Sequence, residues 1–164
     1  MNDANLTTYE QQIVSNVDEY GCHVTMVFDP DGIEPSFSYS TGFSKTVGQP
    51  EVITFGLSKE VMHFMVNETL AQCRKGLVLA DWVEISGLLE GHICVARRVA
   101  PEQIVREYFN SAMWFHLRST GETLTSAYQL VWPGAVDGLF PWQDGCAELV
   151  TERQLALYRT GLNS

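Results

Sequence analysis

Residues 22–41, CHVTMVFDPDGIEPSFSYST, decide the fold of this chain. Polar and apolar residues alternate over 22–28 and again over 36–41, which predicts two strands because successive strand side chains point to opposite faces. The Asp29-Pro30-Asp31-Gly32 stretch between them is typical of a chain reversal, since proline fixes φ and glycine permits a left-handed turn. The segment therefore predicts a β-hairpin.

Helices are predicted on both sides of this hairpin. Thr7 and Glu10 form the pattern of a capping box at the start of the first helix, and Ser58 is the expected N-cap of the second. Apolar side chains at helical spacing give the extent of each helix. The predicted helices cover about residues 7–20, 58–75, 101–115 and 148–158.

Extended apolar runs predict the remaining strands, and Gly- and Pro-rich stretches predict the loops. Because strands lie at both ends of the chain with helices between them, we expect an α+β fold. It should be a single domain over residues 1–164, with a mostly antiparallel sheet or small barrel of about six strands and three to four helices. The further strands are expected at residues 52–55, 78–85, 92–99 and 127–132, with loops at 42–48 and 86–91 and a turn-rich segment at 133–142.

The composition narrows the class of partner. The chain has 164 residues, of which 45% are hydrophobic, and its 10 Lys+Arg against 20 Asp+Glu give a formal net charge of −10. Such a balance argues against nucleic acid and against an anionic membrane surface, because both are bound through clustered basic residues. The N-terminal residues MNDANLTTYEQQ lack the basic and apolar regions of a signal peptide, so we expect a cytoplasmic protein.

Acidic residues are concentrated before Lys45, where no Lys or Arg occurs. Such a segment either attracts a basic partner through its field or forms a solvated helix face followed by a polar turn. The seven acids of this segment are Asp3, Glu10, Asp18, Glu19, Asp29, Asp31 and Glu34.

Two tryptophans near the C-terminus suggest a second contact region. Trp132-Pro133 and Pro141-Trp142 are joined by a turn, so the two rings either line a groove that anchors a partner or close the open end of the sheet. The predicted partner-binding residues are Asp18, Glu19, Asp29, Asp31, Glu34, Trp132 and Trp142.

The strand at residues 36–41 is also a candidate ligand site. Its hydroxyl side chains, followed by Gly42 and Lys45, form a pattern that suits a phosphate. It is faintly similar to the phosphate-holding strand of flavin-binding split barrels, which would make FMN the ligand. The alternative is a sheet with one wet face of serines and one buried face of aromatic residues. The possible ligand-binding residues are Ser38, Ser40, Thr41 and Lys45.

No catalytic or metal-binding signature stands out, so whether the protein is an enzyme stays open, with a non-catalytic protein favoured. A Cys22–His23 dyad is disfavoured because adjacent strand residues point to opposite faces. His92 and Cys94 share a strand face but lack a third ligand at a recognised spacing. A metal hydrolase that uses His23, His63, His92 or His116 is the weakest hypothesis. The four cysteines, Cys22, Cys73, Cys94 and Cys146, form no C-x-x-C pair and are expected to be reduced.

Three segments together resemble the bacterial domain-of-unknown-function 4262 family. They are GCHV at residues 21–24, FSYSTGF with GQPEVITFGL at residues 37–57, and the tail motifs QLVWP at 129–133 and GLFPW at 138–142. The resemblance spans about residues 13–145 and implies a fold without an activity. The family commonly has His where Gln49 stands and an acid where Gly134 stands, so a catalytic role at either position would be lost here.

We therefore expect a non-catalytic cytoplasmic binding protein without a cofactor. Its partner would be a basic protein, for example a toxin domain that it neutralises in the manner of an immunity protein. The alternative is a flavin- or phosphate-ligand-binding redox protein of split-barrel type. The sequence leaves the identity of the partner and the oligomeric state open.

Overall fold

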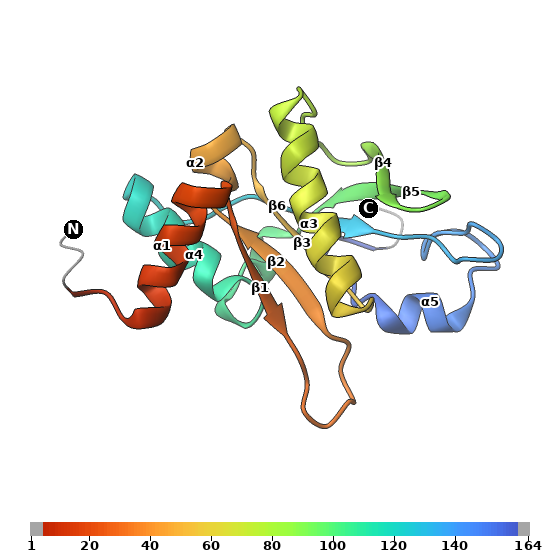
Figure 1. Ribbon diagram of the computed structural model, residues 1–164. Helices are drawn as coiled ribbons and strands as arrows, with labels where there is room; N and C mark the ends of the chain where they lie inside the picture. The colour runs from red at the N-terminus through yellow and green to blue at the C-terminus, as the bar shows by residue number, and fades with distance from the viewer. Residues whose placement is uncertain (1–4, 161–164) are drawn as a thin grey trace.

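The computed structural model describes residues 5–160, which form one six-stranded sheet and five α-helices (Figure 1). This arrangement confirms the predicted α+β class. Predictions that concern residues 1–4 and 161–164, among them Asp3 of the acidic segment, lie outside this description. In chain order the elements are α1 (Thr8–Tyr20), β1 (His23–Val27), β2 (Phe37–Thr41), α2 (Phe43–Val47), β3 (Glu51–Phe55), α3 (Lys59–Arg74), β4 (Glu84–Leu89), β5 (His92–Arg98), α4 (Arg106–Thr120), β6 (Ala127–Val131) and α5 (Glu148–Arg153).

The strands lie in the order β1-β2-β3-β6-β5-β4. The predicted hairpin is confirmed, with His23 opposite Thr41 and Val27 opposite Phe37. All neighbouring strands are antiparallel except β3 and β6, which are joined by a long crossover that includes α3 and α4. Because β1 and β4 are free edges at opposite ends, the sheet is open, and the small barrel considered as an alternative is not formed.

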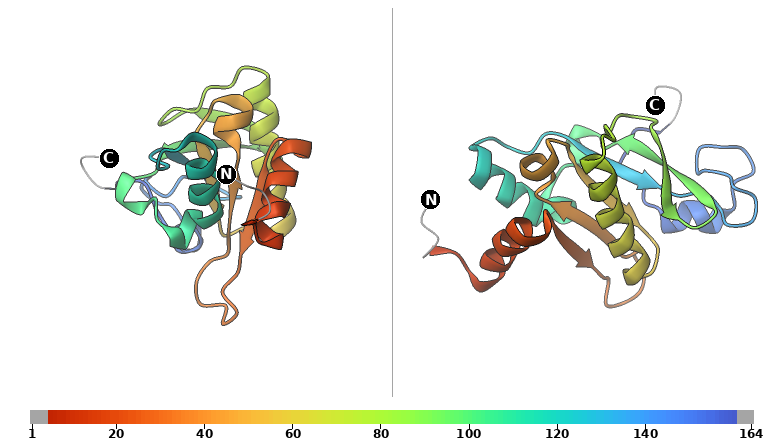
Figure 2. Two further views of the ribbon diagram at one scale, coloured as in Figure 1. Left: turned by 90° about the vertical axis from the view of Figure 1, so that its left-hand side faces the viewer. Right: turned by 45° about the horizontal axis from the view of Figure 1, so that its top comes forward.

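Helices cover both faces of β2. α3 packs against one face and α4 against the other, as the left view of Figure 2 shows. Phe37 and Tyr39 pack under α4, whereas the alternating Ser38 and Ser40 face α3. All five residues of β2 are buried, so the wet serine face expected from the alternation is wrong. The alternation of hydroxyl and aromatic side chains shows only which face of the strand each side chain is on. It does not show which face is exposed, and in β2 a helix covers each face.

The short helix α2 lies within residues 42–48, which were predicted to be a loop. The glycines at both ends, Gly42 and Gly48, were the reason for that prediction. Gly42, the N-cap of α2, has no side chain to accept the free backbone N–H groups. The carboxylate of Glu51 accepts them instead, at 2.8 Å from Gly42 N and 3.1 Å from Phe43 N. A cap that comes from another element cannot be predicted from local sequence.

β4 begins later than the strand predicted over 78–85. Trp82 has a φ of 74°, which an extended backbone does not allow, and the regular strand starts only at Glu84. β4 then runs through residues predicted as a loop, with an irregularity between Ile85 and Leu89 that accommodates Gly87.

Two helices differ from their predicted bounds. Pro101 begins a 3₁₀ turn over Pro101–Gln103, and α4 starts only at Arg106 and continues to Thr120. α5 ends at Arg153 rather than about residue 158.

The chain after α5 crosses the sheet in an extended conformation. The buried amide of Gln129 donates to the carbonyl of Leu155 at 2.9 Å and accepts from the N–H of Leu157 at 2.9 Å. Tyr158 forms a β-bridge with Val99 at the end of β5. The Gln129 side chain on the central strand β6 therefore provides hydrogen bonds to backbone groups of residues 155–157. In a longer α5, these groups would have been bonded within the helix.

Gly56 sets the position of α5, and we predict that Gly56→Ala displaces this helix. Gly56 has a φ of 81°, and a Cβ there would meet the backbone carbonyl of Arg153. Gly32 is the matched control, because its φ is 69° and the space around it is open. We expect Gly32→Ala to lower the free energy of unfolding by about 1 kcal/mol through backbone strain alone, and Gly56→Ala to lower it by roughly 2–3 kcal/mol. Urea unfolding measures both, and equal losses would contradict this packing.

Candidate functional site

Two charged side chains are buried in the sheet, and Glu51 is the first. Its carboxylate is closed in by protein donors: the Ser40 hydroxyl at 2.6 Å and the backbone N–H groups of Gly42 and Phe43. Burial raises the pKa of Glu51 to about 7. The hydrogen bonds favour the charged form and lower the pKa, but the effect of burial is larger. Because every donor near this carboxylate holds β2 or α2 in place, its role is structural.

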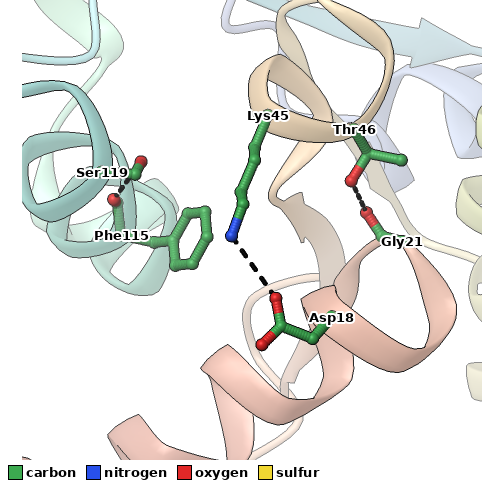
Figure 3. A network of polar contacts seen from close by, with 6 residues as sticks. All are labelled: Asp18, Gly21, Lys45, Thr46, Phe115 and Ser119. Atoms are coloured by element: carbon green, nitrogen blue, oxygen red, sulfur yellow. Dashed lines mark hydrogen bonds and ion pairs between the residues drawn. The ribbon is translucent and has the colours of Figure 1, made fainter. Parts of the chain in front are cut away.

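The residues of the possible phosphate site do not share an open surface. Ser38, Ser40 and Thr41 are fully buried, and Ser40 is bound to Glu51. Lys45 lies outside on α2 and points toward α1, with its Nζ 3.4 Å from Asp18 and 5.9 Å from the Phe115 ring centroid (Figure 3). The geometry therefore does not carry the flavin alternative further.

The predicted acidic residues lie on two separate surfaces. Asp18 and Glu19 are exposed near the end of α1, and Asp18 is paired with Lys45. Asp31 and Glu34 are exposed on the loop that joins β1 to β2 and projects from the bottom of the view in Figure 1, beyond the far end of β1. The concentration of acids in the sequence is thus not one patch in space.

Asp29 orders the loop rather than facing a partner. Its carboxylate accepts the backbone N–H groups of Glu34 at 2.8 Å, of Asp31 at 3.0 Å and of Ile33 at 3.0 Å. These hydrogen bonds, that from Glu34 first, lower the pKa of Asp29. The position of Glu34 therefore depends on Asp29.

The two predicted tryptophans have different surroundings. Trp132 is buried in the core, and its indole N–H donates to the carbonyl of Phe55 at 2.8 Å. Trp142 is half-buried near the surface, stacked on Phe140 at 5.0 Å between ring centroids. Trp132 is therefore a core residue, and Trp142 is the one that lines a groove.

Arg97 on β5 is the second buried charge. Only 2% of it is exposed, and its Nε donates to Asp81 at 3.0 Å. Its guanidinium carbon lies 3.6 Å from the ring centroid of Trp82, 4.6 Å from Tyr158 and 5.1 Å from Trp142. Such cation–π contacts offset part of the cost of burying the charge. We call Arg97, its three aromatic neighbours and Asp81 together the arginine cage.

The arginine cage includes a strained residue. Trp82 is the non-glycine residue with positive φ among residues 5–160, and this conformation places its ring against Arg97. Its N–H is fixed by the carbonyl of Ala96 at 2.7 Å. A bulky residue held in the left-handed region costs free energy and is found preferentially at functional sites.

A groove of about 550 Å³ opens beside the arginine cage. The hairpin loop contributes Glu34 and Pro35, the sheet contributes Arg97, and the C-terminal segment contributes Trp142 and Tyr158. An adjoining hollow of about 370 Å³ continues it and shares Glu34, Pro35 and Glu152. We call the two together the tail groove. The structure thus brings together Glu34 and Trp142, two of the predicted partner-binding residues that lie far apart in sequence.

The thiols and histidines form no comparable site. Burial raises the pKa of Cys22 and of Cys94 to about 12 and that of Cys73 to about 11, which disfavours a reactive thiolate. His23 is packed between α1 and the sheet, with Nδ1 2.9 Å from Asn16 Nδ2. Within residues 5–160, no group of three or more His, Cys, Asp or Glu side chains is placed to hold a metal ion. None of the helices described has the length and apolar character needed to span a membrane.

The two positions that depart from the family pattern make structural contacts. The amide oxygen of Gln49 accepts the N–H of Leu79 at 3.0 Å. Gly134 lies in the turn after β6, and a Cβ there would come within 2.6 Å of Asp137 Oδ1. Gln49 therefore holds the segment before β4, and Gly134 stands where the space for a side chain is already taken by Asp137.

Comparison with known proteins identifies the family. The family model described as "Domain of unknown function (DUF4262)" matches residues 16–147, so the chain belongs to this family. None of the curated proteins and none of the solved structures matches the chain. The matched region includes the cage residues Asp81, Trp82, Arg97 and Trp142, whereas Tyr158 lies beyond it.

Sequence reasoning missed most of the arginine cage. Arg97 carried a weak signal, because it directly follows the apolar run ICVA of β5, and a charge that is buried in such a strand needs a partner. Its partners Asp81, Trp82 and Tyr158 come from separate segments, and nothing in the local sequence links them to β5.

We predict that the pKa of Glu51 makes stability fall as pH rises. In the unfolded chain this carboxyl releases its proton near 4.5, whereas the folded protein keeps it up to about 7. The contribution is therefore fully present below about pH 4.5 and lost as pH rises through about 7, at most about 3 kcal/mol. Glu51→Gln lacks this titration and should flatten the decline, measured by urea unfolding at about pH 5 and about pH 8. His23, whose pKa burial lowers, acts in the opposite direction but equally in both proteins. An identical pH dependence would contradict the assignment.

We predict that Trp82→Ala is more destabilising than Trp82→Gly. Both substitutions remove the ring from Arg97, at a cost of about 1–2 kcal/mol, because the guanidinium is buried while the ring is 46% exposed. Only alanine retains the strained positive φ, so glycine should recover about 1 kcal/mol. Thermal or urea unfolding of the two variants gives the difference. If alanine were the more stable, the left-handed conformation at this position would be wrong.

Proposed function

We propose that this protein is a non-catalytic binding protein that takes a segment of a basic protein partner into the tail groove. The observation that carries the proposal is the meeting of Glu34 and Trp142 in one groove. Acidic side chains on the rim would attract lysine or arginine, and a half-buried tryptophan supplies the kind of contact that dominates binding energy.

The charges of the groove support a basic partner. Glu34 and Glu152 are exposed and line both parts of the tail groove, and Asp31 lies on the same loop. Arg159, also in the wall, is paired with Glu102 at 3.3 Å, and Arg97 is paired with Asp81. Two of the three arginines of the tail groove thus have acidic partners. The third, Arg153, is exposed next to Glu152 in the sequence, and Glu34 and Glu152 face solvent.

The chemistry of the remaining side chains supports a binding role over catalysis. The cysteine thiols are held protonated by burial, and the buried Glu51 is enclosed by structural donors. Neutralisation of a basic toxin domain is one task that such a groove would serve, and a cytoplasmic location would suit it.

We predict that Glu34→Gln/Glu152→Gln weakens binding of a short lysine- and arginine-rich peptide by roughly 5–30-fold, because two rim charges contribute about 0.5–1 kcal/mol each. Fluorescence anisotropy of the labelled peptide measures this change. The matched control is Asp18→Asn/Glu19→Gln, which removes the same charge from α1 and should weaken binding less than about 2-fold. Equal losses in the two double variants would mean that net charge, and not the tail groove, binds the peptide.

A further inference from the structure

The guanidinium of Arg97 has unused hydrogen-bond capacity at the wall of the tail groove. An arginine side chain offers five N–H donors. In the part of the chain that the structure describes, Asp81 is the acceptor for Nε, and the Nη groups have none. Arg97 is only 2% exposed, and its Nη atoms are not among the fully enclosed unpaired side-chain atoms of the described residues, so these donors are open to a ligand.

The surroundings of Arg97 leave one direction free. Trp82 lies against the guanidinium at 3.6 Å, and Tyr158 and Trp142 pack around it. Asp81 occupies the Nε side, and it is itself fixed there by the backbone N–H of Arg98 at 2.8 Å. Because Arg97 also lines the groove, the Nη end is the part that a ligand can reach.

The free end suits a planar monoanion. Two parallel N–H groups in one plane match the two oxygens of a carboxylate, and the aromatic rings restrict the approach to that plane. A doubly charged phosphate is disfavoured, because Asp81 already balances Arg97 and the rim carries Glu34 and Glu152.

We propose that Arg97 is a carboxylate receptor in the tail groove. The carboxylate belongs either to a small organic acid or to the C-terminus of a bound peptide, and both present the same two oxygens. This inference goes beyond the proposed function, because it requires no basic partner. The ligand donates no proton and undergoes no reaction here; its two oxygens accept one N–H from each of the two Nη groups.

The test compares acetate with acetamide, its neutral counterpart of the same shape, in titrations followed by tryptophan fluorescence and calorimetry. We expect acetate to bind and acetamide not to bind, and Arg97→Lys to weaken acetate binding by at least about tenfold, because lysine keeps the charge but lacks the planar fork. The matched control is Arg159→Gln, which removes another arginine of the tail groove and should change binding less than about 2-fold.

A second variant protects the test from misfolding of Arg97→Lys. Asp81→Asn leaves Arg97 in place and removes its competing carboxylate, so acetate binding should be kept or strengthened. Equal binding of acetate and acetamide, or undiminished acetate binding by a folded Arg97→Lys protein, would overturn the proposal.

Two short peptides with acetylated N-termini and no charged side chains identify the source of the carboxylate, one with a free C-terminus and one with a C-terminal amide. Tighter binding of the free-acid peptide than of acetate assigns the receptor to a chain end, and tighter binding of acetate assigns it to small acids. The rim variant Glu34→Gln/Glu152→Gln should not weaken acetate binding, because its glutamates act on basic groups. Loss of basic-peptide binding and loss of acetate binding are therefore separate results.

Discussion

The burial of one guanidinium, that of Arg97, is the constraint on which the C-terminal half of the structure depends. A charge removed from water in the middle of a strand must be compensated, or it destabilises the fold by several kcal/mol. Compensation comes from Asp81 and from three aromatic rings. To deliver the ring of Trp82, the backbone adopts a positive φ and delays the start of β4. To deliver Tyr158, the chain after α5 crosses the sheet and bridges Val99.

Glu51 and Arg97 show two ways of burying a charge. The carboxylate of Glu51 is surrounded by donors from Ser40, Gly42 and Phe43, and its contacts hold α2 and β2 together. Arg97 is equally buried, yet only one of its nitrogen atoms is engaged, and its free end faces a groove. The hydrogen bonds to Glu51 offset part of the cost of burying its carboxyl group and fix the local structure, whereas Arg97 keeps donors free beside a cavity. This difference separates the structural role of Glu51 from the binding role that we propose for Arg97.

Local sequence patterns account for much of the fold. Alternation predicted the β1–β2 hairpin, and the capping pair Thr7 and Glu10 marked the start of α1, where both hydrogen bonds are formed. The failures share one cause, which is stabilisation by residues distant in sequence. Glu51 caps α2 from outside the helix, and Gln129 holds the extended chain that was predicted to be helical. The candidate site was predictable only in part for the same reason: Glu34 and Trp142 were identified from charge and aromatic content, but their proximity depends on the tertiary fold.

We propose that the tail groove is the binding surface and that Arg97 forms part of its wall. The chain has four tryptophans, and their indole N–H groups report on different regions in a two-dimensional ¹H–¹⁵N spectrum. Trp142 and Trp82 contact Arg97, Trp132 is buried in the core, and Trp114 packs beside α1. Titration with a short lysine-rich peptide that has a free C-terminus should shift the signals of Trp142 and Trp82 and leave those of Trp114 and Trp132 in place. Shifts confined to Trp114, on the side of Asp18 and Glu19, would contradict the account.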